Sequence, residues 1–168
     1  MLTSHELFGF MSPDLANEII VFVHDTDKQT YRATLDAVAK ARHVRTVFME
    51  RQPKPQRYAA IISTLSKPGL EQVAGGLLRV WLVKKHRTML ADFVTALGIE
   101  NEEGVVEDLP ATMDDAKLKS AVESLLTKYP PETVAVYLNA FNEMNEANWP
   151  NLKNILESEP RLQLGAHS

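Results

Sequence analysis

Residues 70–97 form the longest helical pattern in the chain, and the apolar side of this pattern changes half-way along it. At about 100° per residue, the apolar residues of the first half share one stripe, and those of the second half cluster on roughly the opposite side. A surface helix needs only one such stripe. The pattern predicts a central helix buried in both halves, first by helices from 13–65 and then by helices from 115–157. The two apolar sets are Leu70, Val73, Ala74, Leu77 and Trp81, followed by Leu82, Val83, His86, Leu90, Phe93 and Leu97.

Helix start and stop signals divide the rest of the chain. Residues 12–14, Ser-Pro-Asp, supply an N-cap, a first-turn proline and a first-turn acid for a helix that ends near His24. This cap favours a helix over a short buried strand for the apolar run 19–23. Residues 44–51 either continue as helix or lead into an extended elbow that the prolines at 53 and 55 impose. Further helices are expected at about 27–42, 56–65, 114–129, 131–144 and 149–157.

Together these signals predict an all-α fold, a single-domain, irregular orthogonal bundle of about seven helices around the central helix 70–97. A chain of 168 residues lies in the single-domain range and can bury a sizeable core. The domain is expected to span residues 1–164, with 165–168 as a disordered tail. Adjacent glycines at 75 and 76 cost about 1 kcal/mol each in a helix interior, which predicts a close helix contact or a bend there.

Cysteine is absent, which excludes disulfides, thiolate nucleophiles and zinc–thiolate sites. This composition fits a reducing compartment, and the first 25 residues show no signal-peptide pattern. The longest apolar stretch, residues 19–23, is far shorter than the about 18 residues of a membrane span. We expect a soluble, cytoplasmic protein with no membrane anchor and no cofactor.

The net charge of −4 conceals an asymmetry along the chain. Residues 1–90 contain 13 Lys or Arg against 8 Asp or Glu, whereas residues 91–168 contain 5 against 14. Opposite charges on the two halves attract each other between copies of the chain. We expect a weak, salt-sensitive homodimer in which part of 40–57 meets acidic residues such as Glu102, Glu103 or Glu107.

The basic residues between positions 40 and 57 are the strongest signal for a partner surface. Cations contact phosphates and aromatic side chains stack on bases, and Phe48 and Tyr58 lie among these cations. The whole protein is acidic, however, and carries no nucleic-acid recognition motif, so a solvated face or a self-association surface is favoured over a specific nucleic-acid site. The candidate surface residues are Arg42, Arg45, Arg51, Lys54 and Arg57.

Histidines are the candidates for chemistry. His86 falls on the apolar face of the central helix beside cations, where a neutral ring would suit a general base, although a core histidine with one hydrogen bond is the simpler interpretation. His24 and Asp25, with His5 and Asp92, have the residue types of a metal-dependent hydrolase site. Asp25 equally suits a helix cap. We expect no metal site.

The loop at 99–110 has the composition of a cation site but not its register. With Gly104 at the sixth position of a calcium loop, Ile99 and Pro110 fall on the first and twelfth positions, and neither offers a side-chain oxygen. A solvated turn is therefore expected. The large aromatic residues at helical spacing are expected in the core rather than in a ligand pocket, namely Trp81, Trp149, Tyr129 and Tyr137.

No phosphate-binding glycine loop, serine elbow or pair of catalytic carboxylates at meaningful spacing occurs in the chain. We interpret the protein as a non-enzymatic protein-interaction or regulatory module. One alternative is a nucleic-acid-binding protein that uses residues 40–57. Another is a small-ligand or metal-dependent enzyme with a site near His86 or near His24 and Asp25.

Overall fold

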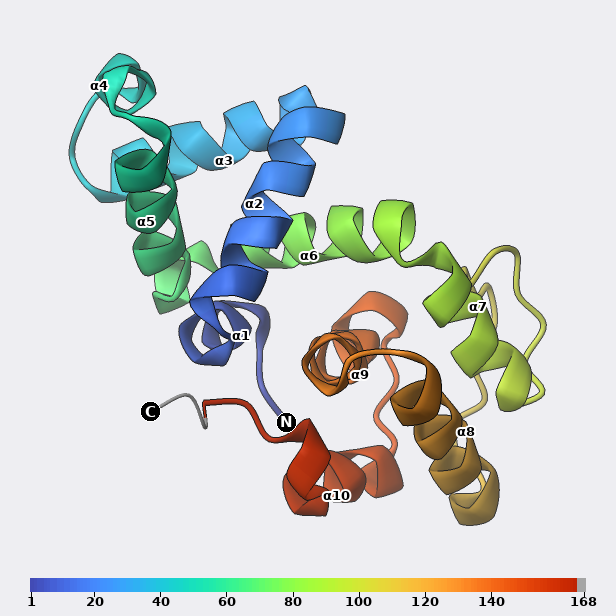
Figure 1. Cartoon of the computed structure of the whole chain (residues 1–168). Coiled ribbons are helices and arrows are strands. Elements are labelled where there is room, and N and C mark those ends of the chain that lie inside the picture. The colour runs from blue at the N-terminus through green and yellow to red at the C-terminus, as the bar shows by residue number, and fades with distance from the viewer. Residues whose placement is uncertain (166–168) are drawn as a thin grey trace. The chain divides into compact units, whose positions relative to one another are not determined.

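Helices make up the regular structure of residues 1–165, the part of the chain that the computed structural model describes (Figure 1). The all-α prediction is confirmed, since the one β interaction in this part is an isolated bridge between Glu102 and Val105. Residues 1–165 contain ten α-helices where about seven were expected. They are α1 (Ser4–Phe10), α2 (Pro13–Thr26), α3 (Lys28–Ala41), α4 (Thr46–Arg51), α5 (Lys54–Leu65), α6 (Glu71–Lys85), α7 (Arg87–Ala96), α8 (Asp115–Lys128), α9 (Pro131–Asn145) and α10 (Pro150–Ser158), with 3-10 helices η1 (Pro68–Leu70) and η2 (Pro160–Leu162).

Two compact units divide the chain, with their boundary inside α6. The N-terminal unit comprises residues 2–81, and the C-terminal unit comprises residues 82–165 together with Met1. In the N-terminal unit, α5 contacts α1, α2 and α3, and α4 contacts α3. In the C-terminal unit, α8 contacts α7, α9 and α10. The single domain over 1–164 stays a prediction, and of the expected tail, residues 166–168 lie outside the described residues.

The predicted central helix 70–97 is wrong, because the segment forms two α-helices separated at His86. His86 has a φ of −110° and a ψ of 30°, outside the helical range. Lys84 and Lys85 occupy the last turn of α6, where cations complement the negative end of the helix dipole and favour a helix end. The change of apolar side therefore reflects two successive helices, each with its own buried face.

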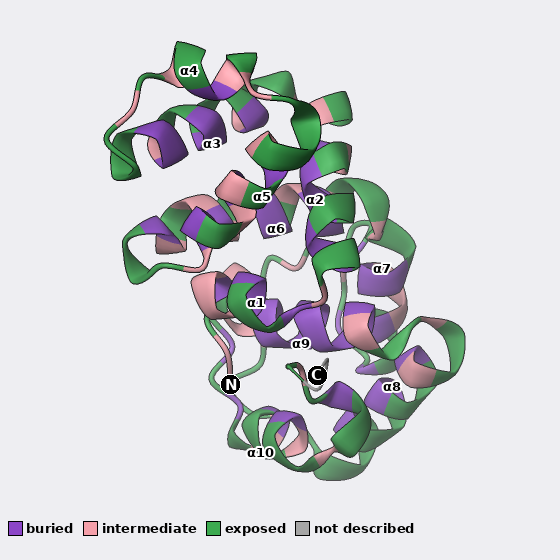
Figure 2. Cartoon of the chain, turned by 60° about the vertical axis from the view of Figure 1, so that its left-hand side comes forward, coloured by how far each residue is buried: buried purple, intermediate pink, exposed green. Residues whose placement is uncertain are grey.

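Helix α9 is buried on all sides over its central part (Figure 2). Its nine consecutive residues 133–141 are all buried. Phe93 of α7 meets Tyr137 and Phe141 edge to face, with ring centroids 5.6 and 5.3 Å apart, and Trp149 lies 5.5 Å from Phe141. Aromatic pairs in this geometry stabilise a core beyond their buried area. The core of the C-terminal unit thus forms around α9, and Tyr137 and Trp149 lie in it as expected.

Helix α1 was not expected from the sequence, because a residue far along the chain caps it. The Glu71 carboxylate accepts hydrogen bonds from the backbone N–H groups of Ser4 (2.7 Å) and His5 (3.0 Å), and it also contacts the His5 ring. Partial burial raises the pKa of Glu71, but the hydrogen bonds from His5 and Ser4 outweigh it and hold this pKa below its ordinary value. The first helix therefore depends on a tertiary contact within the N-terminal unit.

The paired glycines of α6 do not mark a close helix contact at Gly76. A Cβ added at Gly76 would have no other atom within 4 Å, and the residue is exposed. The expectation of a close approach is therefore wrong at this position. The helix continues through both glycines to Lys85.

Candidate functional site

An apolar groove, the α2–α5 groove, lies on the N-terminal unit and has a volume of about 710 Å³. Its walls are α2 and α5, and its remaining side is α1 with the residue that follows it. Lys54 is the one charged residue among those that line it. The lining residues are Phe8, Gly9, Met11, Pro13, Ala16, Asn17, Val21, Lys54, Pro55, Tyr58, Ala59, Ile62 and Ser63.

The walls follow from helical spacing and from the signals that start each helix. The Ser12 hydroxyl oxygen accepts a hydrogen bond from the Leu15 backbone N–H (3.2 Å), which fixes the start of α2. Residues spaced four apart then lie above one another on one face of that helix. Small side chains such as Ala16 and Ala59 leave room between the two walls. The wall rows are Pro13, Asn17 and Val21 on α2, and Pro55, Ala59 and Ile62 on α5.

Val21 is one of the groove residues that the sequence reasoning missed. Ile19, Ile20 and Val23 are fully buried, whereas Val21 is 41% exposed in the groove wall. Five consecutive apolar residues in a helix cannot all face one core, because successive side chains point in different directions. The run 19–23 therefore contained the signal, since at least one of its apolar side chains had to face outwards.

The start of α5 gives one end of the groove a positive character. This helix begins directly after Pro53, and no side chain caps its first turn. The first-turn N–H groups carry the positive end of the helix dipole, and the Lys54 ammonium lies in the same turn. An acidic group on a ligand is favoured at this end.

A second set of side chains, the His24 cluster, brings together residues from two sequence hypotheses. The His24 Nδ1 lies 2.9 Å from Asp25 Oδ1, and the His24 ring is 4.8 Å from the Tyr31 ring, centroid to centroid. The Arg57 guanidinium lies 5.7 Å from the centre of the Tyr58 ring. The Tyr58 ring in turn lies 6.3 Å from the His24 ring, so it links Arg57 of the basic stretch to His24, which the sequence alone did not indicate.

The His24 cluster presents groups that can form hydrogen bonds. Burial raises the pKa of Tyr31, and the nearby Arg57 cation opposes this shift without reversing it, so the hydroxyl is neutral at physiological pH. The Tyr31 hydroxyl and the Arg57 Nε are buried without a hydrogen-bond partner of good geometry. The cluster offers donors and an imidazole–carboxylate pair.

The five predicted partner-surface residues lie in different surroundings. Arg42 is exposed and donates a hydrogen bond to the Thr64 hydroxyl (3.3 Å), Lys54 lines the groove and Arg57 is half-buried. Arg45 is the N-cap residue of α4 and Arg51 is its last residue, and both are exposed. Of the two aromatic residues in that stretch, Phe48 is 55% exposed and Tyr58 only 7%. One aromatic face is thus available for stacking instead of two.

The remaining histidine and carboxylate candidates occupy separate places. His86 is half-buried at the break between α6 and α7. His5 contacts Glu71, and Asp92 accepts a hydrogen bond from the Tyr129 hydroxyl (2.6 Å). Burial and this bond to Asp92 raise the pKa of Tyr129 to about 12. Within residues 1–165, no three His, Asp or Glu side chains gather closely enough to hold a metal ion.

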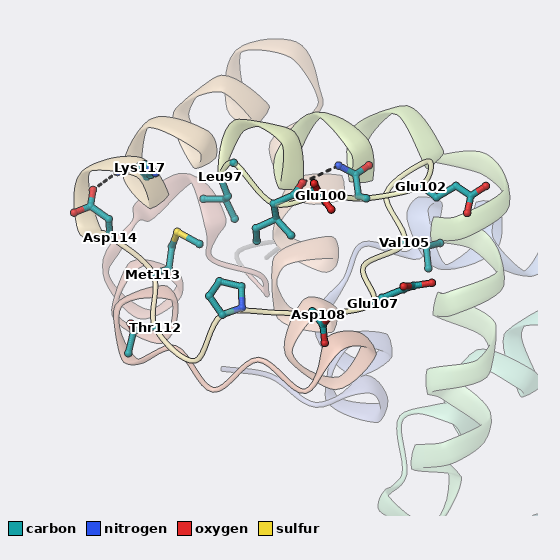
Figure 3. Close-up of a pocket in the computed structure, with 14 residues that line it drawn as sticks. Leu97, Glu100, Glu102, Val105, Glu107, Asp108, Thr112, Met113, Asp114 and Lys117 are labelled. Atoms are coloured by element: carbon teal, nitrogen blue, oxygen red, sulfur yellow. Dashed lines mark hydrogen bonds between the residues drawn. The ribbon is translucent and has the colours of Figure 1, made fainter.

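The loop after α7 forms a second concave surface, the acidic hollow, with a volume of about 770 Å³ (Figure 3). Five carboxylates and one ammonium line it, together with apolar side chains such as Leu97 and Met113. Figure 3 shows the acidic side chains spread around the hollow rather than converging on one point. The charged lining residues are Glu100, Glu102, Glu107, Asp108, Asp114 and Lys117.

Gly104 fixes the turn at the edge of this hollow. Its φ of +87° is in the left-handed region, and a Cβ there would lie 2.9 Å from the Ala91 backbone nitrogen and closer still to the Leu90 side chain. Glu102 and Val105 exchange backbone hydrogen bonds of 2.9 and 3.0 Å across the turn. The Asn101 side-chain oxygen accepts a further bond from the Gly104 N–H (3.0 Å).

Comparison of the chain with family models, with curated proteins and with solved structures finds no match in any of the three. None of the helices in residues 1–165 combines the length and the hydropathy that crossing a membrane requires.

Proposed function

We propose that this chain is a non-enzymatic protein-interaction module that binds an amphipathic helix of another protein in the α2–α5 groove. The observation that carries the proposal is the groove itself, about 710 Å³ in volume, with apolar walls and a single charged lining residue, Lys54. Exposed apolar concavities on proteins commonly serve as binding sites for partners or ligands.

A helix is the favoured ligand because the groove is built from two helices that contact each other. Rows spaced three and four residues apart on α2 and α5 match the i, i+3, i+4 and i+7 anchors of an amphipathic helix. Lys54 and the uncapped start of α5 favour an acidic residue near one end of that ligand. A regulatory role would follow from occupancy of this groove by a partner.

A library of helical peptides with one randomised face, displayed on phage and selected against the whole chain, tests the proposal. We expect the enriched peptides to carry apolar residues at i, i+3 or i+4 and i+7. Val21→Asp should weaken their binding at least about tenfold, measured by fluorescence anisotropy, because it places a charge in the apolar wall.

Val47→Asp is the matched control, since Val47 is 50% exposed on α4 and does not line the groove. It should leave peptide binding unchanged. Selection without enrichment, or peptides that bind the Val21→Asp variant as tightly as the original chain, would contradict the proposal.

The two alternatives find less support. Stacking on nucleic acid would rely on Phe48 without the buried Tyr58, so we expect only weak binding that fades with salt. For an enzyme, the His24 cluster supplies a base but no identified nucleophile. We further propose, from charge and composition, that the chain is cytoplasmic and associates weakly with a second copy of itself.

A further inference from the structure

The most exposed large apolar side chains of the N-terminal unit lie on α4. Val47 is 50% exposed and Phe48 is 55% exposed. Arg45 lies three residues before Phe48, and Arg51 lies three residues after it, so helical spacing puts the cations beside the apolar pair. Neither arginine forms an ion pair within residues 1–165. We name Arg45, Val47, Phe48 and Arg51 the α4 patch.

Two polar contacts hold α4 against α3. The Thr46 hydroxyl donates to the Asp36 carboxylate (2.8 Å), and Arg32 forms an ion pair with Glu50. Both acidic residues are therefore engaged with other partners. The patch presents an apolar centre with positive charge on its flanks.

The C-terminal unit carries a surface of opposite charge at the turn fixed by Gly104. Val105 is 49% exposed at this turn, the largest exposure among the large apolar residues of that unit. Glu102 and Glu107 flank it, and neither forms an ion pair within the part of the chain that the structure describes. Glu103, by contrast, is paired with Arg87 (2.9 Å). We name Glu102, Val105 and Glu107 the acidic turn.

We propose that the α4 patch of one copy of this chain docks on the acidic turn of a second copy. Each surface has an exposed apolar centre and unpaired charges of one sign, and the signs are opposite. Complementary charge selects the partner and speeds the encounter, and contact of Phe48 and Val47 with Val105 removes apolar surface from water. The inference rests on the proposed self-association and is independent of the α2–α5 groove.

The expected association is weak, because each surface is a single short element and exposed ion pairs contribute little. We expect dissociation constants in the high-micromolar to millimolar range. These constants should rise with salt concentration, because salt screens the charges. Sedimentation equilibrium of the whole chain at about 0.05 M and about 0.5 M NaCl measures both properties.

Two charge-reversed variants test the pairing. Arg45→Glu with Arg51→Glu, and Glu102→Lys with Glu107→Lys, should each weaken self-association at least about tenfold, because like charges then face each other. An equimolar mixture of the two variants should associate again, since one copy then supplies an acidic α4 patch and the other a basic turn. Lys67→Glu with Arg79→Glu, two exposed residues of the N-terminal unit, is the control with the same charge change and should associate as the original chain does.

Phe48→Ser tests the apolar centre without a change of charge and should weaken association at both salt concentrations. Far-ultraviolet circular dichroism and denaturation midpoints verify that all variants fold. A strictly monomeric chain at millimolar concentration in low salt overturns the proposal. The proposal is also overturned if the mixture of the two charge-reversed variants fails to associate. It is equally overturned if the Phe48→Ser variant associates as the original chain does.

Discussion

The α2–α5 groove and the acidic hollow enclose nearly the same volume, about 710 and 770 Å³, but their linings have opposite chemistry. Two helices wall the groove, and their spacing aligns apolar side chains in rows. A loop forms much of the hollow, and its side chains point in many directions around a turn that glycine makes possible (Figure 3). The comparison teaches that volume alone does not indicate a ligand. The element that forms the wall decides what a ligand would meet.

The largest effect is expected at the turn of the acidic hollow. Gly104→Ala should lower the free energy of unfolding by about 2–5 kcal/mol, because the new Cβ meets Leu90 and Ala91 and the left-handed backbone is strained without glycine. Chemical denaturation measures this loss. Peptide binding to the α2–α5 groove should be unchanged in native conditions. A loss in the free energy of unfolding below about 1 kcal/mol would mean that the turn at position 104 forms without a glycine at little cost.

The next largest effect is expected at Glu71, whose carboxylate caps α1, one of the helices that line the α2–α5 groove. Glu71→Gln should cost about 1–2 kcal/mol, because the amide accepts weaker hydrogen bonds from the Ser4 and His5 N–H groups. The folded-state pKa of Glu71 is lowered, so its contribution is present above the unfolded pKa and is lost as pH falls through the folded pKa.

Denaturation at several pH values below about 5 measures this loss in the original chain. The Gln variant should lack that part of the pH dependence. Glu107→Gln is the control, because Glu107 is an exposed carboxylate of the acidic hollow without an ion pair. Identical pH profiles for the original chain and the Glu71→Gln variant would refute the capping role.

The smallest effect is expected at Gly76, which lines neither the α2–α5 groove nor the acidic hollow. Gly76→Ala should raise the free energy of unfolding by about 0.5–1 kcal/mol, since the helical position is exposed and a Cβ there meets nothing within 4 Å. The same denaturation assay measures the gain. The opposite signs at positions 76 and 104 separate a glycine that the fold requires from one that it does not. A destabilised Gly76→Ala variant would show that α6 needs this glycine.

Elements whose signals are local could be predicted from the sequence. The side chains of Ser12, Asp27 and Asp114 each cap the helix that follows them, and all three positions carry residue types typical of caps. The break at His86 was missed, although the change of apolar side and the cations Lys84, Lys85 and Arg87 around it both indicated it. The central position of α9 was missed as well, although residues 133–141 are apolar on nearly every side.

The candidate sites were less accessible to sequence reasoning, because their members come from different helices. The His24 and Tyr58 rings, 6.3 Å apart, come together only after α2 and α5 pack, and no spacing rule joins two positions so far apart in the chain. Of the groove, the sequence indicated Lys54 through the basic stretch and offered a signal for Val21 as the outward member of an unbroken apolar run. The acidic composition of the loop at 99–110 could be read from the sequence. The need for glycine at position 104 could not, because it depends on the contact of that position with Leu90.

The cap that Glu71 provides to α1 also sets an order of events during synthesis. Ser4 is made 67 residues before the carboxylate that accepts its N–H bond. At about 5–20 residues per second, a ribosome needs roughly 3–13 s to cover that distance. Until then α1 has no distant cap, and seven residues are too few for a stable isolated helix. Helix α1 is made before the residue that caps it and is therefore among the last parts of its unit to become ordered.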